Sequence, residues 1–102
     1  MRVISSQRYR DADLVEDKRE ALALSNATTV TLPVIPVGTD DLYVLVDGHH
    51  TRDAALELGL AVEYRVLMRG EHDLAALSGE RLLRAAHMGD DYYDVETGCD
   101  VF

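Results

Sequence analysis

Apolar positions along this chain change their spacing from one segment to the next. Residues 13–24 place leucine, valine and alanine on one side of a helical wheel and charged side chains on the other, which predicts an amphipathic helix. Residues 28–37 and 42–46 are rich in valine and other strand-forming residues, and they predict two strands joined by a hairpin turn at residues 38–41. Residues 61–68 alternate between apolar and polar side chains and predict a further strand.

The remaining segments complete the order β-α-β-β-α-β-α. Residues 2–5 predict a short edge strand, and residues 52–58 predict a short helix that ends at Gly59. Residues 73–87 predict the longest helix, or two shorter helices that meet at Gly79. We therefore expect an α+β fold, a small mixed sheet with helices packed on it.

Two features complicate this plan. Pro33 and Pro36 interrupt the second predicted strand, and proline has no N–H to donate to a ladder, so we expect an edge strand or an irregular one. The end of the chain holds five acidic residues and no basic residue. We expect one domain over residues 1–88 and an acidic tail over residues 89–102, which is either a docking strand or a disordered end.

Composition narrows the classes of function. The chain has 102 residues, enough for one small domain, and a formal net charge of -9. Its basic residues are scattered, so sequence-specific DNA binding by this domain is disfavoured. No apolar run approaches the roughly 20 residues that a membrane span needs, and the start lacks the apolar core of a signal peptide. A single cysteine, Cys99, excludes an internal disulfide and predicts a cytoplasmic protein.

The densest chemistry lies where the strand at 42–46 gives way to the short helix. The residues there are Asp47, Gly48, His49, His50, Thr51 and Arg52. The first turn of a helix has N–H groups without partners and the positive end of the helix dipole, which together favour a bound phosphate. This turn is therefore the leading candidate for a binding site.

The run LVDGHHTRDAALELGL at residues 45–60 resembles the ParB/sulfiredoxin superfamily. Many of its members have a strand, then Asp-Gly-His-His-Arg, an alanine-rich short helix, Leu-Gly and a final strand. The upstream elements predicted here come in the same order, so the resemblance covers about residues 3–68. It implies a ParB/sulfiredoxin-like fold and a site for the phosphates of ATP or CTP, usually with Mg²⁺.

The resemblance also implies roles for the motif residues. Gly48 would let the backbone approach the phosphate, and His50 would contact it or transfer a proton. Asp47 would orient the turn or hold the metal ion. The remaining implied nucleotide contacts are His49, Thr51 and Arg52.

Two departures from the family pattern bear on activity. Thr51 stands where the motif has arginine, and Arg52 follows one position later, which turns a side chain by about 100° around a helix. Sulfiredoxins have cysteine directly after the motif glycine, where this chain has His49, so sulfinic-acid reductase activity is not expected.

Two hypotheses of function stay open. The first is a nucleotide-binding domain, with or without weak Mg²⁺-dependent NTPase or phosphotransferase activity. The second is a non-catalytic, acidic protein-binding or inhibitor module of a phage or mobile element, which the small size, the acidity and Thr51 favour. Nuclease activity, also found in the superfamily, is disfavoured by the negative charge.

Each candidate residue also has a purely structural interpretation. The two histidines can belong to a capping turn without chemistry, and Asp47 can simply form the turn before a glycine. Arg52 can pair on the surface with Asp53 or Glu57. Just before the first helix, Arg8 and Arg10 are either phosphate contacts or solvated side chains.

Overall fold

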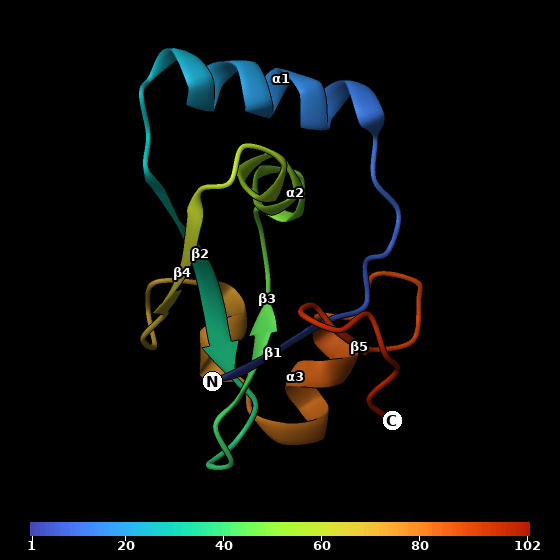
Figure 1. Cartoon of the computed structure of the whole chain (residues 1–102). Helices are drawn as coiled ribbons and strands as arrows, with labels where there is room; N and C mark the ends of the chain where they lie inside the picture. The colour runs from blue at the N-terminus through green and yellow to red at the C-terminus, as the bar shows by residue number, and fades with distance from the viewer.

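A computed structural model of the chain describes all residues, 1–102. It has a five-stranded mixed sheet in the order β4-β2-β3-β1-β5, with helices around it (Figure 1). The α+β fold expected from the sequence is confirmed. The elements in chain order are β1 (Arg2–Ser5), α1 (Ala12–Leu24), β2 (Thr29–Pro36), β3 (Leu42–Leu45), α2 (His49–Glu57), β4 (Ala61–Val66), the 3₁₀ helix η1 (Asp73–Ala76), α3 (Gly79–Ala85) and β5 (Tyr93–Asp94).

The sheet is built on the antiparallel hairpin of β2 and β3. β1 lies parallel to β3, and β4 lies parallel to β2, so each side of the hairpin receives one parallel strand. β5 then pairs antiparallel with β1 and closes that side of the sheet.

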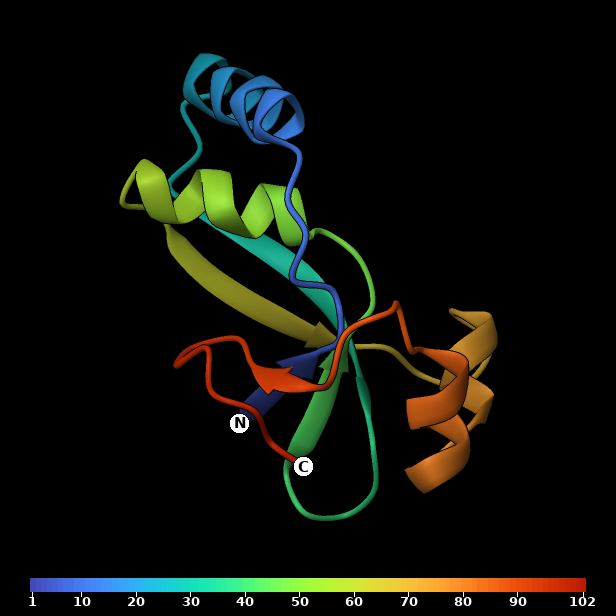
Figure 2. The same ribbon diagram turned by 90° about the vertical axis from the view of Figure 1, so that its right-hand side faces the viewer.

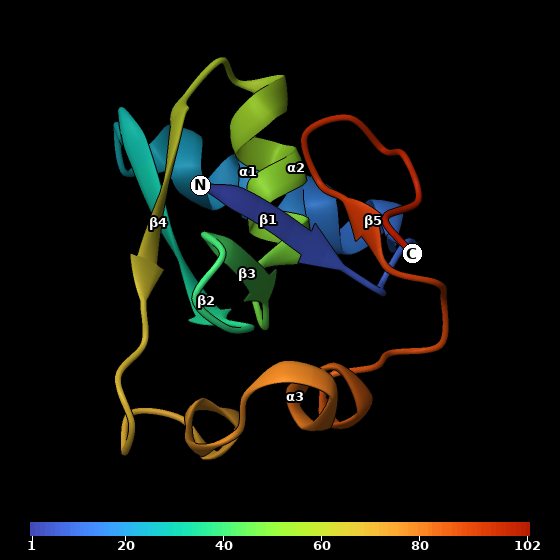
Figure 3. The ribbon, with the colours of Figure 1, turned by 90° about the horizontal axis from the view of Figure 1, so that it is seen from below.

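Successive residues of a strand point to opposite faces of the sheet, and two apolar clusters follow from this alternation. Val3 and Leu45 belong to one cluster, whereas their neighbours Ile4 and Val44 belong to the other. The cluster that contains Ile4 and Val44 also includes Leu82 of α3, so α3 covers that face of the sheet. α2 lies across the opposite face, the one with Val3 and Leu45. α1 packs on α2 rather than on the sheet, so that no residue of α1 is buried (Figures 2 and 3).

Two predictions about strand positions are wrong. β1 is not an edge strand, because it lies between β3 and β5. β2 is an interior strand despite its prolines. Pro33 precedes Val34, the first residue paired with β3, and Pro36 lies two residues beyond Val34, the last residue paired with β4. Each proline therefore lies just outside a ladder that would need its N–H.

The segment at residues 73–87 forms two short helices, as the second alternative predicted, and the longest helix is α1 with 13 residues. Leu77 and Ser78 are extended between η1 and α3, and the Gly79 N–H donates to the Val37 carbonyl. This tertiary hydrogen bond ties the break to the end of β2. α2 also differs from its prediction, since it begins at His49 rather than at residue 52.

The acidic end of the chain includes an ordered strand. Tyr92, Tyr93, Asp94 and Val95 are all buried, and β5 pairs with β1. Of the two alternatives for residues 89–102, the structure therefore has the docking strand. No helix is both long enough and apolar enough to cross a membrane.

Candidate functional site

Gly48 is the N-cap of α2 and sets the direction in which the chain enters the helix. Its φ of +87° lies in the left-handed region that favours glycine. A Cβ at this position would lie 2.7 Å from Leu32 Cδ2, so the space beside the turn is closed as well. The Asp47 carboxylate accepts a hydrogen bond of 2.8 Å from the Gly48 N–H. Asp47 therefore forms the turn, as its structural interpretation predicted.

The first turn of α2 leaves backbone donors free. The helix begins with the Arg52 N–H donating to the Gly48 carbonyl at 2.8 Å. Gly48 offers no side-chain cap, and the N–H groups of His49, His50 and Thr51 have no hydrogen-bond partner in the protein. Such donors at the positive end of a nine-residue helix attract an anion.

These donors belong to a cavity of about 440 Å³ at the N-terminus of α2. The structure brings five of the six predicted site residues into its wall and adds residues from elsewhere in the chain. The lining consists of Gln7, Lys18, Val46, Asp47, Gly48, His49, His50, Thr51 and Met88. Lys18 is the cationic side chain of this wall, and it makes no ion pair within the protein.

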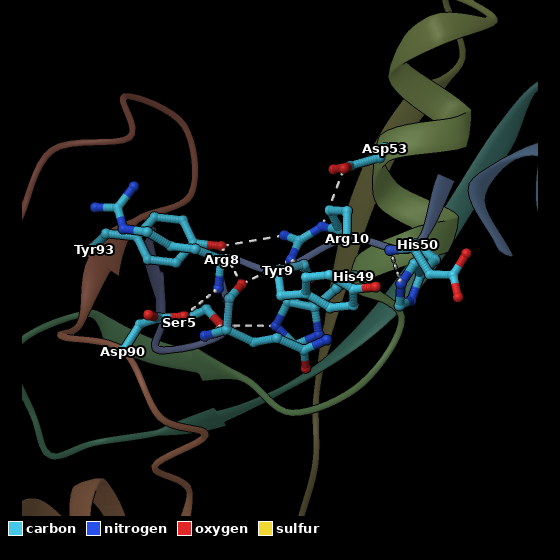
Figure 4. A network of polar contacts seen from close by, with 11 residues as sticks. Ser5, Arg8, Tyr9, Arg10, His49, His50, Asp53, Asp90 and Tyr93 are labelled. Atoms are coloured by element: carbon cyan, nitrogen blue, oxygen red, sulfur yellow. Dashed lines mark hydrogen bonds and ion pairs between the residues drawn. The ribbon is translucent and has the colours of Figure 1, made fainter. Parts of the chain in front are cut away.

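His49 is buried against the end of β1, with 3% of its surface exposed. Its Nε2 lies 2.7 Å from the Ser5 Oγ, which is also buried (Figure 4). Burial, together with the nearby Arg10 guanidinium, lowers the pKa of His49 from 6.5 to about 4. His49 is therefore neutral at pH 7, and its bond to Ser5 ties α2 to the sheet.

His50 has a different partner, because its Nε2 accepts a hydrogen bond of 3.1 Å from the Asp11 N–H (Figure 4). An Nε2 that accepts carries no proton, so the ring holds its proton on Nδ1 in this arrangement. Asp11 is the N-cap of α1, and its carboxylate accepts from the N–H groups of Asp13 and Leu14. His50 thereby links the starts of the two helices.

Arg52 lies outside the cavity, so the prediction that it contacts the nucleotide there is not supported by its position. Its side chain is 8% exposed, its Nε donates to the Tyr64 hydroxyl at 3.1 Å, and a terminal nitrogen lies 3.3 Å from the Glu96 carboxylate. The expected ion pair of Arg52 with Asp53 or Glu57 is wrong, because its partner is Glu96. One step along the helix turns Arg52 toward β4 and the C-terminal loop, away from the cavity.

Arg8 and Arg10 both make polar contacts with other residues of the protein. Arg8 lies over the Tyr93 ring at 4.1 Å and pairs with Asp100 at 2.8 Å. Arg10 Nε lies 3.0 Å from an Asp53 carboxylate oxygen, an ion pair whose N–H is not aligned as a hydrogen bond. Other Arg10 nitrogens donate to the Gln7 and Tyr9 carbonyls and to the Tyr93 hydroxyl. Arg8 is exposed, as the solvated interpretation predicted, although it also contacts Tyr93 and Asp100. Arg10 is only partly exposed and links Tyr93 to Asp53 of α2, which neither interpretation predicted.

Asp47 is the acidic residue of the cavity wall, so its carboxylate is the candidate ligand for a metal ion. The structure contains no group of three or more His, Cys, Asp or Glu residues arranged to hold a metal ion. Mg²⁺ commonly takes one or two carboxylates, with phosphates and water as its other ligands. The donor set therefore suits a Mg²⁺ ion that arrives with phosphates and not one held by the protein alone.

Sequence reasoning missed Lys18, Gln7 and Ser5. Lys18 is the only lysine in the chain, yet its position within α1 carries no motif. It reaches the cavity because α1 packs along α2, a contact between segments about 30 residues apart that no local pattern encodes. Comparison of the chain with models of protein families, with curated proteins and with solved structures finds no match.

Proposed function

We propose that the cavity at the N-terminus of α2 binds the phosphate groups of a nucleotide, ATP or CTP. The observation that carries this proposal is the set of unpartnered N–H groups at His49, His50 and Thr51, which belong to the cavity wall. Lys18 adds a positive charge without a protein partner, and a volume of about 440 Å³ lies within the range of small-molecule sites. The resemblance of the Asp-Gly-His-His turn to the ParB/sulfiredoxin motif supports the same ligand class.

The arrangement favours binding over phosphoryl transfer. Transfer needs a cation beside the charge that develops on the phosphoryl group and a group that accepts a proton. Arg52 is committed to Tyr64 and Glu96, and His50 Nε2 is committed to the Asp11 N–H. Lys18 or Mg²⁺ would have to supply the cation in place of Arg52, and a step with His50 as the proton acceptor would require its bond to the Asp11 N–H to break. We therefore propose a binding domain whose hydrolysis rate is low.

Mg²⁺ would enter the site with the phosphates. Asp47 is the residue whose exposed carboxylate would share the ion with them. The ion would supply neutralising charge. Asp47 itself keeps its bond to the Gly48 N–H and so preserves the turn that presents the free donors.

The second hypothesis, a non-catalytic acidic protein-binding or inhibitor module, has two observations in its favour. The net charge is -9, and the motif arginine is turned into a structural contact. On that hypothesis the turn at Gly48 would be retained for the fold alone. Nucleotide-dependent stabilisation separates the two hypotheses.

The test measures thermal unfolding and calorimetric binding with ATP, CTP and GTP, each with and without Mg²⁺. A ligand at 100 times its Kd adds about 2.7 kcal/mol of stability, a shift of several degrees for this size. Lys18→Gln should raise the Kd for the nucleotide about tenfold, because it removes one charge-assisted hydrogen bond to a phosphate. The matched control is Arg81→Gln on α3, an exposed arginine that has no ion pair and lies outside the cavity wall.

Arg52→Gln tests whether Arg52 takes part in binding, because Arg52 belongs to the motif but lies outside the cavity wall. We expect it to lower stability and to leave the Kd of the folded protein unchanged. No shift with any nucleotide at millimolar concentration would refute the proposal and favour the protein-binding module. Equal binding by wild type and Lys18→Gln would place the ligand at another surface.

A further inference from the structure

The outer edge of β4 presents unpaired backbone groups. Ala61, Glu63 and Arg65 face β2 in the parallel ladder, which begins with the Ala61 N–H on the Thr28 carbonyl and ends with the Leu67 N–H on the Val34 carbonyl. The N–H and C=O groups of Val62, Tyr64 and Val66 therefore point away from the sheet, and they have no hydrogen-bond partner in the protein. β4 is the last strand on its side of the sheet and pairs only with β2.

The opposite edge of the sheet is protected. β5 is only two residues long, and Tyr93 is bridged there by Asp100 of the C-terminal loop. A short edge covered by a loop is a common way to prevent further pairing. The six-residue β4 contains no proline, pairs with β2 without a bulge and is the last strand of the sheet on its side. The two edges of this sheet thus differ in how open they are to another strand.

We propose that β4 pairs with β4 of a second copy of this chain, antiparallel, about a two-fold axis at Tyr64. In this register Val62 faces Val66 of the second copy, and Tyr64 faces its own counterpart. Every residue whose backbone points outward then meets another such residue. Each of these facing pairs exchanges both of its hydrogen bonds, as the alternating pattern of an antiparallel ladder requires.

The charges on β4 select this register. Glu63 and Arg65 are exposed and lie on the same face of the strand. The axis at Tyr64 puts Glu63 of each copy opposite Arg65 of the other, which gives two pairs of opposite charge. An axis at Glu63 or at Arg65 would put like charges directly opposite each other, which is destabilising. An axis at Val62 or Val66 would shorten the pairing. At Val62 both charges would face uncharged residues, and at Val66 Arg65 would face Leu67 and Glu63 would meet Arg69 only beyond the end of β4.

Arg65 is already paired with Glu71 of its own chain. A guanidinium has five N–H donors in a planar fork, so it can bond to Glu71 on one side and to Glu63 of the second copy on the other. Charged residues on an edge strand normally prevent pairing with a foreign strand. Here the sequence Glu-Tyr-Arg complements itself in one antiparallel register, which favours a second copy over other partners.

The apolar face of β4 fits the same arrangement. Val62, Tyr64 and Val66 are half-buried and pack against the cluster that contains Val34 and Leu45. The Tyr64 ring is held by Arg52 and Glu96, so it would enter the interface already ordered. Pairing of the two edges would join the clusters of both copies into one continuous apolar layer.

The experiment measures the molar mass of the full chain by sedimentation equilibrium from micromolar to millimolar concentration. Wild type should dimerise. Glu63→Arg puts like charges opposite each other and should raise the dimer Kd at least tenfold, and Arg65→Glu should do the same. The double variant with both exchanges restores opposite pairs and should restore the dimer. An equimolar mixture of the two single variants should form a heterodimer.

Glu80→Arg on α3 is the matched control, since Glu80 forms an exposed pair with Arg84 far along the chain from β4. Circular dichroism of every variant shows whether it is folded, and the heterodimer arm remains informative if Arg65→Glu loses stability with its Glu71 contact. A monomeric wild type at millimolar concentration would overturn the proposal. A dimer unaffected by the single charge reversals would assign the interface to another surface and would overturn it too.

Discussion

Gly48 is the most constrained single residue of the candidate site. It combines a φ of +87° with a neighbour, Leu32 Cδ2, that an added Cβ would meet at 2.7 Å. We predict that Gly48→Ala lowers the free energy of unfolding by about 2–3 kcal/mol, the sum of backbone strain and a clash in a packed region. Urea unfolding followed by circular dichroism measures this change.

Gly59→Ala is the matched control for that substitution. Gly59 also has a positive φ, +72°, but a Cβ there would meet nothing within 4 Å. Gly59→Ala should therefore lower the free energy of unfolding only through backbone strain, by about 1 kcal/mol. Equal losses for the two variants would mean that the Leu32 side chain moves aside without cost.

His49 leads to a prediction about acid stability. Its pKa is about 4 in the folded protein, mainly because it is buried, against 6.5 in the unfolded chain. The unfolded state therefore binds a proton first as the pH falls. The stability contributed by the neutral ring is complete above pH 6.5 and is lost progressively down to about pH 4. The 2.5-unit difference corresponds to about 3 kcal/mol.

The variant His49→Gln keeps a hydrogen-bonding group for Ser5 but cannot titrate. Urea unfolding at a series of pH values should give a flatter curve for this variant than for wild type between pH 6.5 and 4.5. Carboxylates with lowered pKa, among them Asp94 and Glu71, lose their contribution only below that window. Parallel curves for the two proteins across the window would contradict the assignment.

At the scale of elements, α1 depends on contacts at its start. No residue of α1 is buried, whereas its N-cap Asp11 donates its N–H to His50 of α2, and Arg10 pairs with Asp53 of α2. A helix with little burial opens locally at low cost. The polar contacts between the two helix starts therefore control how often α1 detaches.

We predict that His50→Ala speeds hydrogen exchange of the α1 amides about fivefold, the effect of losing a hydrogen bond worth about 1 kcal/mol. Exchange in β2 and β3 should not change. His72→Ala is the control, because His72 caps η1 through the Leu74 N–H and does not touch α1. Unchanged exchange in α1 would show that its packing along α2 is sufficient.

At the scale of the whole molecule, the C-terminal segment completes the fold. Tyr92 and Tyr93 are buried, Asp94 pairs with Arg2 at 3.1 Å, and the Val95 N–H donates to the Val3 carbonyl. We predict that removing residues 92–102 leaves the chain unfolded, since the lost core contacts cost about 5 kcal/mol or more, comparable with the stability of a small domain. Near-ultraviolet circular dichroism and thermal unfolding test this.

Removal of Phe102 alone is the control. Its side chain is 73% exposed and makes one edge-to-face contact with Tyr92. The unfolding temperature should fall by no more than about 6 °C. A cooperative transition in the shorter chain that ends at Asp91 would contradict the prediction. The same result bears on the protein-binding hypothesis, because trimming this segment would remove the fold together with any docking surface.

Local sequence determined much of this protein. The positions of β2, β3 and β4, the α1 helix, the hairpin between β2 and β3 and the polar turn before α2 all followed from spacing and turn residues. These features depend on interactions within a few residues, through the helical and strand periods and the left-handed preference of Gly48. The free donors of the candidate site were predictable for the same reason, since every helix start has them.

Tertiary structure decided the rest. Strand order made β1 and β2 interior and gave the acidic end a place beside β1. Packing of α1 on α2 brought Lys18 to the cavity, and the approach of Tyr64 and Glu96 drew Arg52 away from it. These outcomes depend on contacts between residues far apart in the chain, for which neither periodicity nor turn chemistry carries a signal.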